Sequence, residues 1–72
     1  MNKTFKVIKV ASISTTSYED AIQNAIMEAH ETLRGLNWFQ VLEQRGRIDE
    51  TGKIVEWQVI VEVAFKLEHH KG

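Results

Sequence analysis

Two side chains in this sequence, Trp38 and Gln58, have the chemistry to hold a flat ring molecule. The indole of a tryptophan offers a flat apolar surface on which another ring system can stack. The amide of a glutamine carries a carbonyl acceptor beside an NH₂ donor, and this pair matches a ring edge that presents N–H next to C=O. Trp38 can equally be an interface tryptophan with no ligand, and Gln58 by itself is an ordinary strand glutamine. The pair becomes informative only if the fold places both side chains on one surface.

The stretch from Leu36 to Gly46 is typical of a strand, and it begins directly after a helix stop signal at Gly35. Side chains alternate between two faces along a strand, so the residues divide into two sets. One set contains Phe39, Val41 and Glu43, and the other contains Trp38, Gln40, Leu42 and Gln44. A chain this small has one core, so only one of the two faces can be buried within the subunit. We therefore predict that Trp38 lies on a face that nothing else in the chain covers.

A single helix is predicted over residues 18–34. Ser17 is placed to act as its N-cap, and Asp20 resembles the acidic partner of a capping box. Gly35 is predicted at the C′ position, where helices commonly end. Alanine recurs every four residues, and larger aliphatic side chains lie beside it, which gives one apolar stripe formed by Ala21, Ala25, Ala29, Ile22, Ile26 and Leu33. The small alanines would let the helix axis approach a sheet closely.

Three strands are predicted around this helix. The first covers residues 4–11, the second 36–48 and the third 53–67, and a glycine-containing turn at 49–52 joins the last two as a hairpin. The third strand has an unbroken apolar face formed by Val55, Trp57, Val59, Val61, Val63, Phe65 and Leu67. This face is the predicted partner of the alanine stripe. Residues 68–72 are predicted to be a polar tail.

The element order is β-α-β-β, so we predict one α+β domain over residues 1–72. The first two strands are joined through the helix and are expected to run parallel, with a right-handed crossover. Placing the most apolar strand in the middle gives a three-stranded antiparallel or mixed sheet of order 1-3-2, packed on one helix. Trp38 and Gln58 then share the opposite face with Leu42, Ile60 and Ala64. A contiguous apolar patch of this kind predicts an interaction surface, so we expect a homo-oligomer that buries this face between subunits.

The composition narrows the classes of protein to consider. The chain has 72 residues, and a domain of that size is marginal in stability unless it gains support from disulfides, a metal or association. It has no cysteine, which excludes disulfides and fits a reducing cytoplasm. The net charge of −1 gives no support for nucleic-acid binding. No apolar run reaches the roughly 20 residues of a membrane span, and the N-terminal residues lack the apolar core of a signal peptide.

No metal site and no catalytic site are predicted. His69 and His70 are adjacent and would point apart on an extended chain, and the tail that holds them resembles a remnant of an expression tag. Asp49 and Glu50 lie in a turn without the ligand spacing of a calcium loop. His30 falls on the solvated face of the helix, and no nucleophile is paired with a base. The residues therefore give no positive sign of catalysis.

The ordered set of motifs resembles the dodecin family over nearly the whole chain. No single motif is specific to the family. The order of the motifs is specific when it is taken together with the chain length and the order of elements. The matching segments are Ser17-Tyr18-Glu19-Asp20-Ala21-Ile22, Thr32-Leu33-Arg34, Asn37-Trp38-Phe39-Gln40-Val41, Glu43-Gln44-Arg45-Gly46, Gly52-Lys53-Ile54, Glu56-Trp57-Gln58-Val59 and Val63-Ala64-Phe65.

This resemblance implies a subunit that assembles into a hollow dodecamer and binds pairs of flavins, such as FMN or riboflavin, where subunits meet. A tryptophan that matches Trp38 stacks on the flavin ring, and a glutamine that matches Gln58 hydrogen-bonds its polar edge. The family is regarded as storing or buffering flavin and not as enzymes, and some bacterial members also carry coenzyme A. Three basic residues have open roles. Alternation along the strand places Arg45 and Arg47 on the face away from Trp38, unless Gly46 marks a β-bulge. Arg45 is expected to reach an FMN phosphate or to pair with Glu43 or Asp49; Arg47 is expected to form such an ion pair; and Lys66 would meet coenzyme A phosphates or solvent.

Three classes of function therefore compete. The first is flavin storage with quenching of flavin photochemistry, which the resemblance favours. The second is a flavin-dependent enzyme, which would need room for a substrate beside the reactive ring. The third is a structural assembly domain that binds no flavin.

Overall fold

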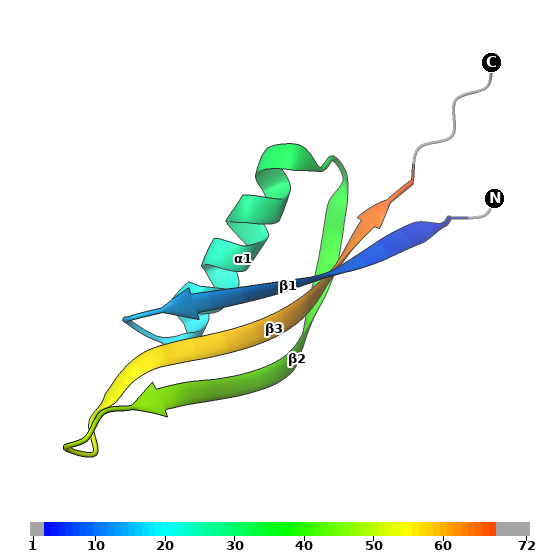
Figure 1. The fold of residues 1–72 in the computed structure, drawn as a ribbon. Helices are drawn as coiled ribbons and strands as arrows, with labels where there is room; N and C mark the ends of the chain where they lie inside the picture. The colour runs from blue at the N-terminus through cyan, green and yellow to red at the C-terminus, as the bar shows by residue number, and fades with distance from the viewer. Residues whose placement is uncertain (1–2, 68–72) are drawn as a thin grey trace.

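A computed structural model describes residues 3–67 and shows one helix packed on one face of a three-stranded sheet (Figure 1). The elements are β1 (Phe5–Ser14), α1 (Tyr18–Thr32), β2 (Leu36–Ile48) and β3 (Ile54–Lys66). β3 lies between the other two strands and pairs antiparallel with both, so the order is 1-3-2. The predicted α+β fold is therefore confirmed, with β1 and β2 parallel on either side of β3. Within the described range no helix is long and apolar enough to cross a membrane.

The core lies between α1 and the middle of the sheet. Its buried members are Ala21, Ala25, Val59, Val61 and Val63. Alternate residues of β3 point toward α1, and the alanine methyl groups bring the helix onto them. α1 packs over β1 and β3 far more than over β2. β2 is consequently less covered than the other strands: Leu36 and Val41 pack against the core, but Phe39, which pairs with Val63 on the helix side, stays about half exposed.

The start of α1 is fixed by two serines and an aspartate. The Ser17 hydroxyl accepts a hydrogen bond from the Asp20 backbone N–H at 3.0 Å, as expected of an N-cap. The Asp20 carboxylate accepts from the Ser14 hydroxyl at 2.7 Å, and Ser14 Oγ accepts in turn from the backbone N–H of Thr16 and of Ser17. In a capping box, the acidic side chain accepts a hydrogen bond directly from the N-cap backbone N–H. Here the buried Ser14 hydroxyl lies between the two groups and bonds to both. β1 reaches Ser14, beyond the expected residue 11, because residues 12–14 continue to pair with β3.

The helix ends at Thr32, two residues before the predicted end at Arg34. Leu33 has an extended backbone, with φ −117° and ψ 149°, although its N–H still donates to the Ala29 carbonyl at 3.0 Å. Gly35 lies beyond the C′ position and has a φ of +77°, a conformation that favours glycine. Its carbonyl accepts from the Lys66 N–H at 2.9 Å, which fixes the start of β2 against the end of β3.

Gly46 is required by a close approach between β2 and β3. A Cβ atom at this position would lie 2.7 Å from the Glu56 backbone carbonyl oxygen, closer than van der Waals contact allows. We expect Gly46→Ala to destabilise the protein by about 1–3 kcal/mol, because the backbone must shift to admit the methyl group. Urea denaturation at a fixed subunit concentration measures the effect. Gln44→Ala, at an exposed position of the same strand, should change stability by less than about 0.5 kcal/mol, and an equal loss in both variants would contradict the steric explanation.

Candidate functional site

The sheet face opposite α1, here called the outer face, carries the residues singled out from the sequence. Residues directly opposite each other on paired strands share a face, so the register defines the outer face row by row. Its members are Phe5, Val7, Lys9, Ala11 and Ile13 of β1, Trp38, Gln40, Glu43, Arg45 and Arg47 of β2, and Glu56, Gln58, Ile60, Glu62, Ala64 and Lys66 of β3. The outer face thus holds Trp38 and Gln58 together, as the alternation of side chains predicts.

A β-bulge in β2 places Arg45 on the outer face too. The register advances by two residues on β2 and by one on β3 between Val41 and Glu43, so Leu42 is an extra residue. The alternation after Leu42 is therefore reversed. The predicted grouping of Glu43 with the helix-facing Val41 is wrong, as is the expectation that Arg45 and Arg47 face away from Trp38. The bulge that brings the two arginines to the face of Trp38 lies at Leu42 and not at Gly46.

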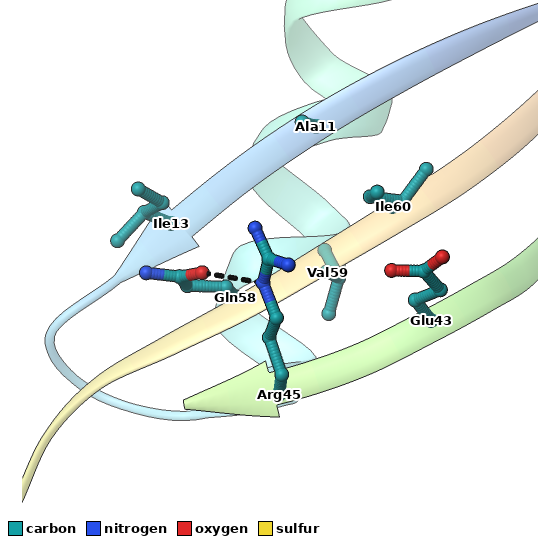
Figure 2. Close-up of a pocket in the computed structure, with 7 residues that line it drawn as sticks. All are labelled: Ala11, Ile13, Glu43, Arg45, Gln58, Val59 and Ile60. Carbon is teal, nitrogen blue, oxygen red and sulfur yellow. Dashed lines mark hydrogen bonds between the residues drawn. The ribbon is translucent and has the colours of Figure 1, made fainter. Parts of the chain in front are cut away.

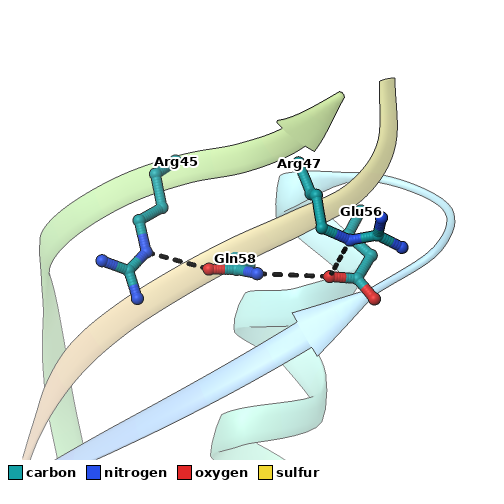
Figure 3. Close-up of polar contacts among 4 residues, drawn as sticks. All are labelled: Arg45, Arg47, Glu56 and Gln58. Carbon is teal, nitrogen blue, oxygen red and sulfur yellow. Dashed lines mark hydrogen bonds and ion pairs between the residues drawn. The ribbon is translucent and has the colours of Figure 1, made fainter. Parts of the chain in front are cut away.

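Gln58 lies at the centre of a chain of four polar side chains that runs from Arg45 to Arg47 (Figure 3). Arg45 Nε donates to Gln58 Oε1 at 2.8 Å, and Gln58 Nε2 donates to Glu56 Oε1 at 3.2 Å. Arg47 Nε lies 3.3 Å from the same Glu56 oxygen. The ion pair expected of Arg47 therefore forms with Glu56 and not with Glu43 or Asp49. Glu56 was missed in the sequence, although its position two residues before Gln58 puts both on one strand face.

The polar chain fixes which way the Gln58 amide points. An arginine can only donate, and an ionised carboxylate can only accept, so the amide oxygen must face Arg45 and the NH₂ group must face Glu56. The hydrogen bond from Arg47, followed by that from Gln58, holds the pKa of the Glu56 carboxyl below its usual value of 4.5. Glu56 is therefore a carboxylate at neutral pH. One lone pair and one N–H of the Gln58 amide stay available for a ligand.

Arg45 and Gln58 border a shallow hollow on the outer face (Figure 2). Its volume is about 90 Å³, and its other lining residues are Ala11, Ile13, Glu43, Val59 and Ile60. A second hollow of about 180 Å³ lies between α1 and the start of β2 and includes Trp38. Pockets that bind drug-sized molecules measure roughly 300–1,000 Å³. Neither hollow of a single subunit is large enough to enclose a ring molecule of that size.

Trp38 lies far from the polar chain. It pairs with Ala64, which is six residues from Gln58 on β3 and therefore roughly 20 Å away at about 3.4 Å per residue. The sheet thus places Trp38 and Gln58 on one face, as expected, but at opposite ends of it. The indole is 49% exposed, and its ring centroid lies 4.7 Å from that of Phe5, which the sequence analysis had not singled out.

The remaining candidate residues do not form a site within the subunit. Lys66 is exposed on the outer face, opposite Phe5. Among residues 3–67, no three His, Asp or Glu side chains are grouped as metal ligands. His69, His70 and the rest of the predicted polar tail at 68–72 lie outside the described residues.

The fold is that of one small class of β-α-β-β protein. A model of the dodecin family matches residues 4–68. The chain is 46% identical to the dodecin of Thermus thermophilus over 68 residues, which cover 94% of this chain and 97% of that protein. It is 33% identical to the calcium dodecin of Mycobacterium tuberculosis over 63 residues, covering 88% of this chain and 87% of that protein. The chain therefore belongs to the dodecin family, as its motifs had indicated.

Solved structures agree with this assignment. The crystal structure of the tt0972 protein from Thermus thermophilus superimposes with a TM-score of 0.87 at 43% identity, covering 96% of this chain and all of that one. Dodecin from Streptomyces davaonensis gives a TM-score of 0.87 at 38% identity, with 96% and 100% coverage.

Proposed function

We propose that this protein binds a flavin, FMN or riboflavin, between subunits, and that it stores the flavin and quenches its photochemistry. Trp38 stacks on the ring in this proposal, and Gln58 hydrogen-bonds the polar edge. The observation that carries it is the half-exposed indole on an outer face that α1 does not cover. Stacking on an aromatic ring system requires such an open flat surface.

The flavin site must be shared between subunits. Trp38 and Gln58 of one chain are roughly 20 Å apart, which exceeds the width of a flavin ring system, so they cannot hold one ring together. A Trp38 from one subunit and a Gln58 from another can. The same association would enlarge the small hollow at Arg45 and Gln58 into an enclosed site. We propose the hollow dodecamer of the family as the assembly, located in the cytoplasm.

Storage explains this arrangement better than catalysis. A flavin ring that stacks on Trp38 with one face and on the second flavin of a pair with the other has no free face on which a second substrate can approach the reactive part of the ring. An indole in contact with an excited flavin can donate an electron to it, which dissipates the light energy before the flavin can react further. We therefore propose a binding protein and not an enzyme. Flavin-dependent oxidation of NADH by the loaded protein would support the enzymatic alternative.

Calcium and coenzyme A are the alternative ligands. One relative is named calcium dodecin, and Lys66 offers an exposed cation for the phosphates of coenzyme A. Isothermal titration of the flavin-free protein with calcium, coenzyme A and riboflavin separates the three. Tight binding of calcium or coenzyme A with none of riboflavin would replace the flavin proposal.

The absorption spectrum of the purified protein tests the proposal most simply. We expect a visible flavin band that stays with the protein through gel filtration and is released on denaturation. Protein purified without flavin should take up riboflavin in equilibrium dialysis. A colourless protein that takes up neither riboflavin nor FMN would leave only a structural role in assembly.

Arg45→Ala separates two contributions that the Arg45 side chain makes to flavin binding. Its Nε hydrogen bond orients Gln58, so loss of the side chain should weaken the binding of riboflavin and FMN alike. The two terminal NH₂ groups of its guanidinium can in addition meet the FMN phosphate, and charge-assisted hydrogen bonds of this kind contribute about 1.5–3 kcal/mol. We therefore expect FMN to lose at least tenfold more affinity than riboflavin in fluorescence titrations. Equal losses for both ligands would show that Arg45 acts only through Gln58.

A further inference from the structure

Phe5 and Trp38 come from strands that are not neighbours, yet their rings touch. β1 and β2 lie on either side of β3 (Figure 1), so their backbones are roughly 9–10 Å apart. The two ring centroids are only 4.7 Å apart. Both side chains must therefore lean toward each other across β3. This direction is not the one that a strand side chain takes by default, which is roughly perpendicular to the sheet.

The burial of Ala64 is a second observation on the same part of the outer face. Ala64 lies on the outer face between Trp38 of β2 and Val7 of β1, and it is 0% exposed. It is not part of the core cluster beneath α1. An alanine on the uncovered face of a sheet is buried only if neighbouring side chains close over it. Trp38 and Val7, which lie directly opposite Ala64 on the two flanking strands, are placed to do so, and the Phe5 ring contacts Trp38.

The contact covers one part of the indole and leaves the rest open. The ring planes are tilted by 56°, which is a tilted contact and not a stack. Phe5 therefore meets the indole at an angle and does not lie parallel to it as a stacked ligand would. The indole remains 49% exposed in this position.

We propose that Phe5 is a positioning residue for Trp38, and that Phe5 and Ala64 together hold the indole in one orientation before a ligand binds. The expected consequence is that a pre-oriented indole binds flavin more tightly than a mobile one, and this consequence rests on the proposed function. It also makes a statement about the flavin-free protein that holds whatever the ligand is. The orientation of Trp38 depends on an aromatic ring at position 5 and on a small side chain at position 64.

The flavin-free protein provides the first test. Trp57 lies on the helix side of the sheet, so a Trp57→Phe background leaves Trp38 as the only tryptophan. We expect Phe5→Leu in this background to reduce the near-UV circular dichroism of Trp38 by at least half, because leucine keeps the site apolar but cannot hold the indole as a ring does. Phe5→Tyr should retain the signal. Far-UV circular dichroism and light scattering show whether the variants keep their fold and assembly.

Riboflavin binding provides the second test. Phe5→Leu should weaken it about tenfold, the upper part of the range for loss of an aromatic pair, while Phe5→Tyr stays close to wild type. Ala64→Val should act in the same direction as Phe5→Leu, because its larger side chain lifts both rings. An unchanged tryptophan signal in Phe5→Leu would overturn the proposal, and so would a lost signal with unchanged riboflavin affinity. If the wild-type protein binds no riboflavin, the proposed function fails, and the circular dichroism still decides whether Phe5 orients Trp38.

Discussion

Replacing Trp38 with alanine is expected to abolish most of the quenching of flavin fluorescence on binding. Electron transfer from the indole requires contact with the ring, and no other outer-face residue can supply it. Binding should weaken by about 2–3 kcal/mol, or roughly 30- to 150-fold, because both the stacking contact and the buried apolar area are lost. Titration of riboflavin into flavin-free wild-type and variant protein, followed by fluorescence, measures both effects.

Two matched variants isolate the role of Trp38. Trp57→Phe removes the other tryptophan, which lies on the helix side, and should leave both quenching and affinity close to wild type. Gln58→Ala should weaken binding while the bound fraction stays quenched, because it removes the contact with the ring edge and not the stack. Wild-type protein that leaves flavin fluorescence unchanged at saturation would show that Trp38 does not stack on flavin.

Association of the outer faces is expected to give a particle of about twelve subunits, and a single charge placed on that face should break it. Ile13 is 56% exposed within the subunit, so a lysine there leaves the packing of the subunit intact. In the assembly, the same lysine would be an unpaired buried charge, which is strongly destabilising. We expect Ile13→Lys to fall to small species in multi-angle light scattering at micromolar concentration, where the wild-type protein remains assembled.

Met27→Lys is the matched control for this experiment. Met27 is 54% exposed, almost the same as Ile13, but it lies on α1 and not on the outer face. The Met27→Lys variant should therefore retain the wild-type mass. Trp38→Ala should retain it too, since the contacts between subunits are proposed to extend well beyond the ligand. A wild-type protein that is monomeric at micromolar concentration would rule out the shared flavin site.

The elements were predictable because each one is marked by local signals. Ser17 caps the helix, alanines repeat at helical spacing, and glycine at position 52 marks the hairpin turn. β3 was recognisable as the central strand because every second residue along it is apolar, without interruption. These signals depend on neighbours within a few residues, and the structure agrees with them. The end of β1 was less accurate, because Ser14 pairs with Trp57 of β3, far along the chain. The end of α1 was also misplaced, because Leu33 already takes an extended conformation two residues before the glycine at position 35.

The arrangement of the candidate site was only partly predictable. Counting alternate residues placed Trp38 and Gln58 on one face, and the structure agrees. The same count misplaced Arg45, because an extra residue at Leu42 reverses the alternation along β2. A bulge depends on how two strands pair, and no residue type at Leu42 marks it. The hydrogen bond from Arg45 to Gln58 follows from the bulge and was therefore not expected.

The sequence by itself determined the family, the β-α-β-β order and the presence of a tryptophan on the face that the helix leaves bare. Periodicity and motif order are properties of the chain alone, and they survive whatever register the strands adopt. Only the tertiary structure decided that Arg45 joins Gln58, that both lie roughly 20 Å from Trp38, and that the Phe5 ring contacts the indole across β3. These features depend on pairing register and on contacts across a middle strand, where residues far apart in sequence meet.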